Sequence, residues 1–138
     1  MKLLLDTCAV IDLMTDPDSL GQGFRNIYDD PENIPYISAE TERELVVHFN
    51  NKRLLSKFFE NSDEMLWSLQ KHYGLRVLPV TDAIIHTYAQ LELNLAQEHR
   101  DPSDHVIIAH AITERLTLLS SDQKFPFYRN QGLDLIEY

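Results

Sequence analysis

The sequence contains little of several residue types that define common classes of protein. Among its 138 residues there is one cysteine, Cys8, and there are four glycines. A single cysteine can form no disulfide within the chain and has no second thiolate with which to hold a metal ion. We expect Cys8 to be a small core residue in a protein of a reducing compartment. The glycines form neither a phosphate-binding loop nor a dinucleotide-binding fingerprint, and Gly21 and Gly23 indicate a turn.

Long apolar runs are also absent. No run approaches the roughly 18 residues that a membrane-spanning helix needs. The opening MKLLLD reaches an acid before the core of a signal peptide could form. We therefore expect a cytoplasmic protein that does not enter the membrane. The hydrophobic content of 43% can supply a packed core, and the length predicts a single domain over residues 1–138.

Positive charge is scarce, since 12 basic residues face 22 acidic ones and the net charge is −10. This balance argues against nucleic-acid binding, because proteins of that class usually place Lys and Arg along the phosphate backbone. The objection weakens if some acids gather in a site where divalent cations neutralise them. The positions of the acids in the predicted fold therefore decide the question.

Short apolar runs that end at polar residues predict the strands of a buried parallel sheet. Residues 29–35 are expected to form a loop between the first two strands, because they are rich in Pro and Asx. The predicted strands are Lys2–Leu5, Tyr36–Ser38, Leu75–Val80, Leu116–Ser120 and Leu133–Ile136.

Apolar spacing and capping residues predict helices between these strands. Ser38 and Thr81 are expected caps, and Asp101-Pro102 opens a helix that must be largely buried, because it has almost no polar face. The predicted helices are Cys8–Met14, one from Ala39 to the Asn50-Asn51 joint, Lys52–Lys71, one after Thr81 and one after Asp101. The order β-α-β-α-α-β-α-α-β-β predicts an α/β fold, a three-layer α/β/α sandwich around a mainly parallel sheet.

Two of the predicted strands run into acids. Asp6 follows the first strand and Asp122 follows the fourth, and open α/β sheets bind their ligands at the carboxyl ends of strands. Asp104 lies in the first turn of the buried helix and Glu44 in the second turn of the helix after the second strand. Both can point over the same edge of the sheet, so the sequence predicts four converging carboxylates.

Four carboxylates at such short distances from one another cannot all stay ionised in a dry pocket. Either their pKa values rise or a cation joins them. With oxygen ligands and neither Cys nor clustered His among them, the site favours Mg²⁺ or Mn²⁺ over Zn²⁺. Such an ion lowers the pKa of a water, aligns it with a phosphodiester and stabilises the leaving oxygen. The pattern therefore indicates hydrolysis of an RNA or DNA backbone.

At these residues the sequence resembles the PIN-domain ribonucleases and, among them, the toxin subunits of VapBC-type toxin–antitoxin pairs. Four blocks carry the resemblance over nearly the whole chain, in the family's order: LLLDT, ISAETERELV, HRDPSDHVIIAHA and LLSSDQKF. The resemblance implies a metal-dependent endoribonuclease with a PIN-like fold and no cofactor beyond Mg²⁺ or Mn²⁺. The metal ligands and catalytic residues that it implies are Asp6, Glu44, Asp104 and Asp122, with Asp101 as a supporting acid and Ser120 at a Ser/Thr position of the last block.

The resemblance also implies partners, namely an RNA substrate, a second copy of the chain in a homodimer, and a small antitoxin. The antitoxin would wrap the toxin and block its acidic groove with a basic segment. The chain departs from the family's DPFDR pattern at Ser103 and His105, where Phe and Arg are common, and has His48 where the family has Lys. All four acids remain, so the departures bear on substrate choice and protein contacts more than on metal binding.

Simpler structural interpretations exist for several of these residues. Asp101 and Asp104 also make a good helix start near the positive end of the helix dipole. Glu44 alone could be one of several solvated helix acids. The histidines of the chain's second half lack the spacing of a zinc-hydrolase motif, so we expect exposed or hydrogen-bonded side chains at His99, His105 and His110.

Two other features have competing interpretations. Trp67 is expected in the core or in an interface rather than as a platform on which bases stack. The one basic cluster, Lys52, Arg53 and Lys57, is either a contact to RNA phosphates or a solvated helix face.

Two other functions fit parts of the pattern. A phosphatase of the haloacid-dehalogenase type also begins with an Asp at the end of a strand, but it needs a second Asp two residues on, and position 8 is Cys. The other alternative is a catalytically weak PIN-like interaction module whose pocket holds metal poorly. The full set of four acids favours the nuclease.

Overall fold

The computed structural model describes residues 1–138 and contains one sheet of five strands that all run parallel. Their order across the sheet is β3-β2-β1-β4-β5, so β1 lies at the centre. The strands are β1 (Lys2–Leu5), β2 (Ile34–Ser38), β3 (Arg76–Leu78), β4 (Thr117–Ser120) and β5 (Asp134–Glu137).

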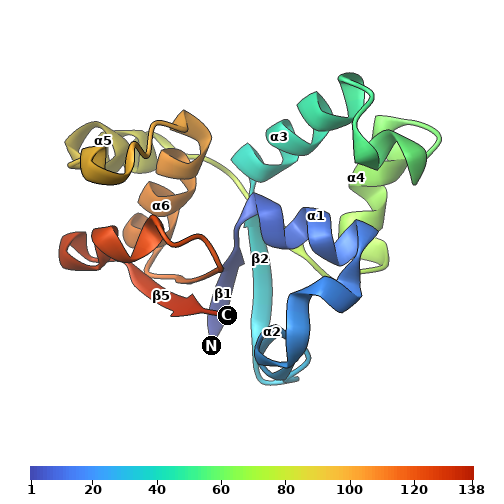
Figure 1. Ribbon diagram of the computed structural model, residues 1–138, viewed down its shortest axis with the longest axis horizontal. Helices are drawn as coiled ribbons and strands as arrows, with labels where there is room; N and C mark the ends of the chain where they lie inside the picture. Colours follow the sequence, from blue (N-terminus) through green and yellow to red (C-terminus); the bar gives the residue numbers. More distant parts are fainter.

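Helices cover both faces of this sheet (Figure 1). One face carries α1 (Thr7–Thr15), α2 (Gly21–Tyr28), α3 (Ala39–Asn50) and α4 (Ser62–Lys71), and the other carries α5 (Asp82–Gln90) and α6 (Pro102–Glu114). Short 3-10 helices complete the chain: η1 (Pro17–Leu20), η2 (Leu54–Lys57), η3 (Leu95–Gln97) and η4 (Phe125–Gln131). The predicted three-layer α/β/α sandwich is confirmed. None of the helices is long and apolar enough to cross a membrane.

Alternate residues of the central strands fill two separate cores, because successive side chains of a strand point to opposite faces. Leu3 and Leu5 of β1 belong to the core that includes α1, α2, α3 and α4, whereas Leu4 belongs to the core that includes α6 and η4. Leu119 and Leu118 of β4 divide between the two cores in the same way. Burial on both faces explains why these strands have continuous apolar sequences.

The connections between strands reverse direction at β1. The chain passes from β1 to β2 and β3 on one side, and then returns to place β4 and β5 on the other side. Open α/β sheets form a crevice at the carboxyl ends of the strands where the order reverses. Leu5 of β1 pairs with Leu119 of β4, so the residues that follow these strands lie at the same edge.

The predicted helix Lys52–Lys71 is wrong over its first ten residues, whereas residues 62–71 form α4. Residues 54–57 form η2, and α4 begins at Ser62 because the Asn61 side chain accepts a hydrogen bond from the Glu64 N–H and caps a new helix. The predicted loop at residues 29–35 is also too long, because Ile34 and Pro35 pair with β1 and belong to β2.

The turn predicted at Gly21 and Gly23 is wrong as well, because both residues lie in α2. Gly21 has a φ of 74°, a conformation in which side chains are strained, and so allows the chain to change direction between η1 and α2. The buried ring of Phe24 then fixes α2 against the core. The element order therefore contains α2, which the predicted order lacks.

Candidate functional site

Five carboxylates line one cavity of about 360 Å³ at the carboxyl edge of the sheet. They follow β1 and β4 or lie on α3 and at the start of α6, and they are Asp6, Glu44, Asp101, Asp104 and Asp122. The structure therefore brings together all four predicted ligands and the predicted supporting acid. Their role in metal binding and catalysis stays a prediction.

Asp6 is the most deeply buried of these acids, with 3% of its surface exposed. It caps α1, since its Oδ1 accepts from the Ala9 N–H at 2.8 Å, and its Oδ2 accepts from the Ser120 hydroxyl. Burial raises the pKa of Asp6 to about 6, and the nearby charges of Asp104 and Asp122 add to this rise, against the two hydrogen bonds. The cavity thus holds a carboxyl that is costly to ionise.

Glu44 reaches the cavity from the second turn of α3, the helix that Ser38 caps through the Glu40 N–H. Its Oε1 accepts a hydrogen bond from the Thr7 hydroxyl. The Thr7 hydroxyl also lies 3.2 Å from that of Thr41, so α1 and α3 are joined beside the carboxylate. This pair of threonines fixes the side chain of Glu44 relative to α1.

Asp122 is held by a local turn after β4. Its Oδ1 accepts from the Lys124 N–H at 2.9 Å, and its own N–H donates to the Ser120 hydroxyl oxygen at 3.1 Å. Ser120 therefore connects Asp122 to Asp6, because the same hydroxyl donates to the Asp6 carboxylate. The Ser120 side chain couples the ends of the two central strands.

Asp101 and Asp104 lie at the start of α6. Asp101 is the predicted cap, with its Oδ1 accepting from the Ser103 N–H at 2.9 Å and with Pro102 in the first turn. Burial raises the pKa of Asp104 to about 7, and the charges of Asp101, Glu44 and Asp122 add to the rise. Two carboxyls of one cavity, those of Asp104 and Asp6, thus have pKa values well above the usual range.

His99 is a residue of this site that the sequence analysis missed. Its Nε2 lies 2.9 Å from Asp104 Oδ2, and single ligand atoms of His99, Asp104 and Asp122 lie within 4.8 Å of one another. Burial lowers the pKa of His99 and so favours the neutral ring. A usable signal was its place in the block HRDPSD, five residues before Asp104.

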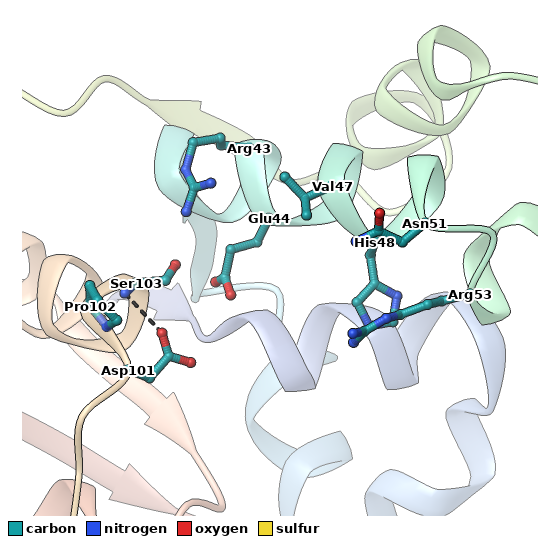
Figure 2. Close-up of a pocket in the computed structure, with 9 residues that line it drawn as sticks. All are labelled: Arg43, Glu44, Val47, His48, Asn51, Arg53, Asp101, Pro102 and Ser103. Atoms are coloured by element: carbon teal, nitrogen blue, oxygen red, sulfur yellow. Dashed lines mark hydrogen bonds between the residues drawn. The ribbon is translucent and has the colours of Figure 1, made fainter.

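A second cavity of about 260 Å³ adjoins the acidic one between α3 and the start of α6 (Figure 2). The two cavities share Glu44, His48, Arg53 and Asp101. Arg43 is paired with Glu40, whereas Arg53 takes part in no ion pair. The second cavity therefore places cationic and amide side chains next to the acidic one, and they are Arg43, Asn51 and Arg53.

The predicted basic cluster is divided by the structure, because Arg53 lines both cavities and Lys52 and Lys57 line neither. One expectation about other side chains is wrong, and another is wrong in part. Cys8 is exposed rather than in the core, because the first turn of α1 faces the acidic cavity. Trp67 is not in the core, since 66% of its surface is exposed, and its place in an interface stays a prediction.

The remaining histidines of the chain's second half are buried and hydrogen-bonded on one ring nitrogen. His105 Nε2 lies 3.0 Å from the backbone oxygen of His99, and His110 Nδ1 lies 2.9 Å from the Ser38 hydroxyl. The expected hydrogen bonds are therefore present. Neither side chain lines the acidic cavity.

The chain is a parallel α/β sandwich with carboxylates clustered at the carboxyl edge of its sheet. This combination places it among proteins that have a candidate cation site at that edge. The family model of the PIN domain matches residues 3–131, so the chain belongs to the PIN domain family. No curated protein matches the chain significantly.

Solved structures share this fold. One chain of VapBC2 from Rickettsia felis aligns with a TM-score of 0.73 and 21% identity, over 99% of this chain and 98% of that chain. That structure contains VapBC2 bound to a DNA fragment from its promoter. VapBC-1 from nontypeable Haemophilus influenzae aligns with a TM-score of 0.71 and 20% identity, over 99% of this chain and 98% of that chain. VapBC-5 from Mycobacterium tuberculosis is described as a member of the VapBC family of toxin–antitoxin systems. It aligns with a TM-score of 0.66 and 21% identity, over 99% of this chain and 98% of that chain. These identities show a common fold.

Proposed function

We propose that this protein is a metal-dependent endoribonuclease that hydrolyses RNA phosphodiester bonds and is the toxin component of a type II toxin–antitoxin pair. The observation that supports this most strongly is the convergence of five carboxylates from four separate elements on one cavity. Capping accounts for Asp6 and Asp101, but it gives no reason for Glu44, Asp104 and Asp122 to face them.

The donor set of the cavity fits a hard divalent cation. Carboxylate oxygens are the ligands that Mg²⁺ and Mn²⁺ prefer. The raised pKa values of Asp6 and Asp104 reflect burial and, to a smaller extent, repulsion by neighbouring carboxylates, and a bound cation would offset both. We assign the ligands as Asp6, Glu44, Asp104 and Asp122, with Asp101 as the supporting acid.

A cation at this site would supply positive charge for the phosphodiester and acidify an attacking water. The chain's own contribution is to hold the oxygens in place before substrate arrives. Ser120 and the Ala9 N–H fix both oxygens of Asp6, and Thr7 fixes Glu44. Because these bonds lie within the chain and those of Asp6 are buried, the carboxylates need little rearrangement when a substrate binds.

The adjoining cavity supports a polyanionic substrate in spite of the net charge of −10. Arg53 is free of ion pairs and borders both cavities, so its guanidinium is available to a phosphate next to the cleaved one. Asn51 offers amide groups on the same side of the cavity. We infer that the RNA strand runs from the acidic cavity along α3.

The proposed partners follow from the same charge pattern. A small antitoxin with a basic segment would complement the acidic cavity and exclude RNA from it. Among the solved structures with this fold, VapBC-5 is described as a member of the VapBC family of toxin–antitoxin systems, which supports such a partner. We also propose that residues 1–138 fold as one domain, that the protein is cytoplasmic and that it forms a homodimer.

The experiment is cleavage of a mixed cellular RNA pool by the purified protein in Mg²⁺, in Mn²⁺ and in EDTA, with single-stranded DNA as a second substrate. We expect RNA to be cut only with metal and Asp6→Asn to be inactive. Asp63→Asn is the matched control, because Asp63 is exposed on α4 outside the acidic cavity. Equal inactivity of wild type and Asp6→Asn in every buffer would contradict the proposal and favour the interaction module.

A further inference from the structure

We propose that His99 is a positioning residue for Asp104, which it holds through its Nε2–H so that Asp104 Oδ1 stays free for the cation. The inference rests on the proposed metal site. In this proposal His99 acts on the ion only by orienting Asp104. The imidazole is not itself a ligand of the ion, although it lies among the acids.

Three hydrogen bonds, of which the first two are buried, connect the backbone at Asn94, the N-cap of η3, to the acidic cavity. The Asn94 N–H donates to the Tyr128 hydroxyl oxygen at 3.1 Å, and that oxygen lies 2.9 Å from His99 Nδ1. His99 Nε2 lies 2.9 Å from Asp104 Oδ2. Asn94, His99 and Tyr128 are all at most 2% exposed, so water does not compete for the two bonds among them.

The hydrogen-bond pattern determines which ring nitrogen carries the proton. With the proton on Nε2, that N–H donates to the Asp104 carboxylate and Nδ1 accepts from the Tyr128 hydroxyl, so every donor is used. With the proton on Nδ1, the Tyr128 hydroxyl proton has no acceptor, and the Nε2 lone pair faces a carboxylate oxygen at 2.9 Å. Buried donors without partners are rare and lone pairs repel, so the Nε2–H form is favoured.

The backbone of His99 is held as firmly as its ring. Its N–H donates to the Asn94 oxygen at 3.0 Å, and its own oxygen lies 3.0 Å from His105 Nε2. The ring packs edge to face against Tyr128 and His105. A donor fixed in this way holds one oxygen of Asp104 in one direction, whereas the structure contains no hydrogen bond to Oδ1.

This arrangement excludes the ring from the coordination of the ion. A nitrogen ligates a metal through a lone pair, and the only lone pair of this ring accepts from Tyr128. An outer residue that orients a ligand typically contributes a factor of roughly 10 to 100 in metal affinity. We therefore expect the loss of His99 to weaken the binding of the ion without removing any of its ligands.

The first test uses the metal-free wild-type protein at pH 8, with ¹H–¹⁵N correlation spectra of its imidazoles. The expected result is the Nε2–H form of His99. The Nδ1–H form would overturn the proposal, and this measurement needs neither a variant nor cleavage activity.

The second test measures Mn²⁺ affinity by calorimetry and the nitrogen couplings of the bound ion by pulsed electron paramagnetic resonance. We expect His99→Leu to weaken binding roughly 10- to 100-fold, and His99→Gln to restore part of it, because its amide N–H can donate to Asp104. His72→Leu is the control, since His72 is an exposed residue at the end of α4.

A coupling from a directly bound imidazole nitrogen, or wild-type affinity in a folded His99→Leu variant, would overturn the positioning role. Failure of the wild type to bind Mn²⁺ at all would overturn the metal-dependent function instead. The two failures are therefore distinguishable.

Discussion

Replacement of Asp6 by asparagine should stabilise the metal-free protein at high pH. The pKa of Asp6 rises from 3.8 to about 6 on folding, chiefly because the side chain is buried. The folded protein therefore binds more protons than the unfolded chain in this window, so stability is greatest below pH 3.8 and falls as the pH rises through about 6. The raised pKa of Asp104 acts in the same direction up to about pH 7.

The size of the effect follows from the change in pKa. One pKa unit corresponds to about 1.4 kcal/mol, so ionised Asp6 costs the metal-free protein about 3 kcal/mol at pH 8. Asparagine keeps the cap of α1, because its oxygen can accept from the Ala9 N–H. The Ser120 hydroxyl, which donates to Asp6, must turn to accept from the new amide group. Asp6→Asn should thus be more stable than wild type by up to about 3 kcal/mol at pH 8, and about equal to it at pH 4.

The assay is urea unfolding followed by far-ultraviolet circular dichroism between pH 4 and pH 8 in EDTA, with Asp63→Asn as the control. Addition of Mn²⁺ at 1,000 times the dissociation constant should reverse the order, because an ion that binds only the folded wild type then stabilises it by about 4.1 kcal/mol. Parallel pH profiles of wild type and Asp6→Asn, or a loss of stability at every pH, would refute the reasoning.

Three further changes test other parts of the site. Asp122→Asn should reduce cleavage of RNA by at least about 100-fold in Mg²⁺ with circular dichroism unchanged, and wild-type activity would remove this residue from the site. Arg53→Ala should weaken the binding of uncleaved RNA and lower the slope of its salt dependence by about 1. Arg76→Ala is the control and should leave both quantities unchanged. Equal slopes for Arg53→Ala and wild type would contradict the proposed path of the RNA strand along α3. Thr7→Val should slow cleavage by roughly 10-fold in single turnovers, because Glu44 loses the hydroxyl that orients it, and an unchanged rate would show that this bond is dispensable.

The parts of the fold that depend on neighbouring residues could be predicted from the sequence. Ser38, Thr81 and Asp101 cap helices as expected, because a side chain that accepts from an N–H two or three residues on is a local interaction. Asp6 and Asp122 lie at one edge of the sheet because their strands are neighbouring and parallel.

Features that depend on distant contacts could not be predicted. His99 is brought to Asp104 and held by Tyr128, which is 29 residues away, so its spacing carries little information about its partners. The exposure of Cys8 depends on the cavity in front of α1, which forms only when α3 and α6 pack beside it. The start of α2 at Gly21 could not be predicted, because a glycine in a sequence usually indicates a turn rather than the first residue of a helix.

The central claim is that the acidic cavity holds the cation that makes the protein a nuclease. The most direct test is a Mn²⁺ titration in which occupancy of the site and the rate of RNA cleavage are measured in the same samples of wild type and Asp104→Asn. We predict that cleavage rises in proportion to occupancy in wild type, and that Asp104→Asn loses both. Cleavage that persists in EDTA, or Mn²⁺ binding that Asp104→Asn leaves unchanged, would contradict the claim.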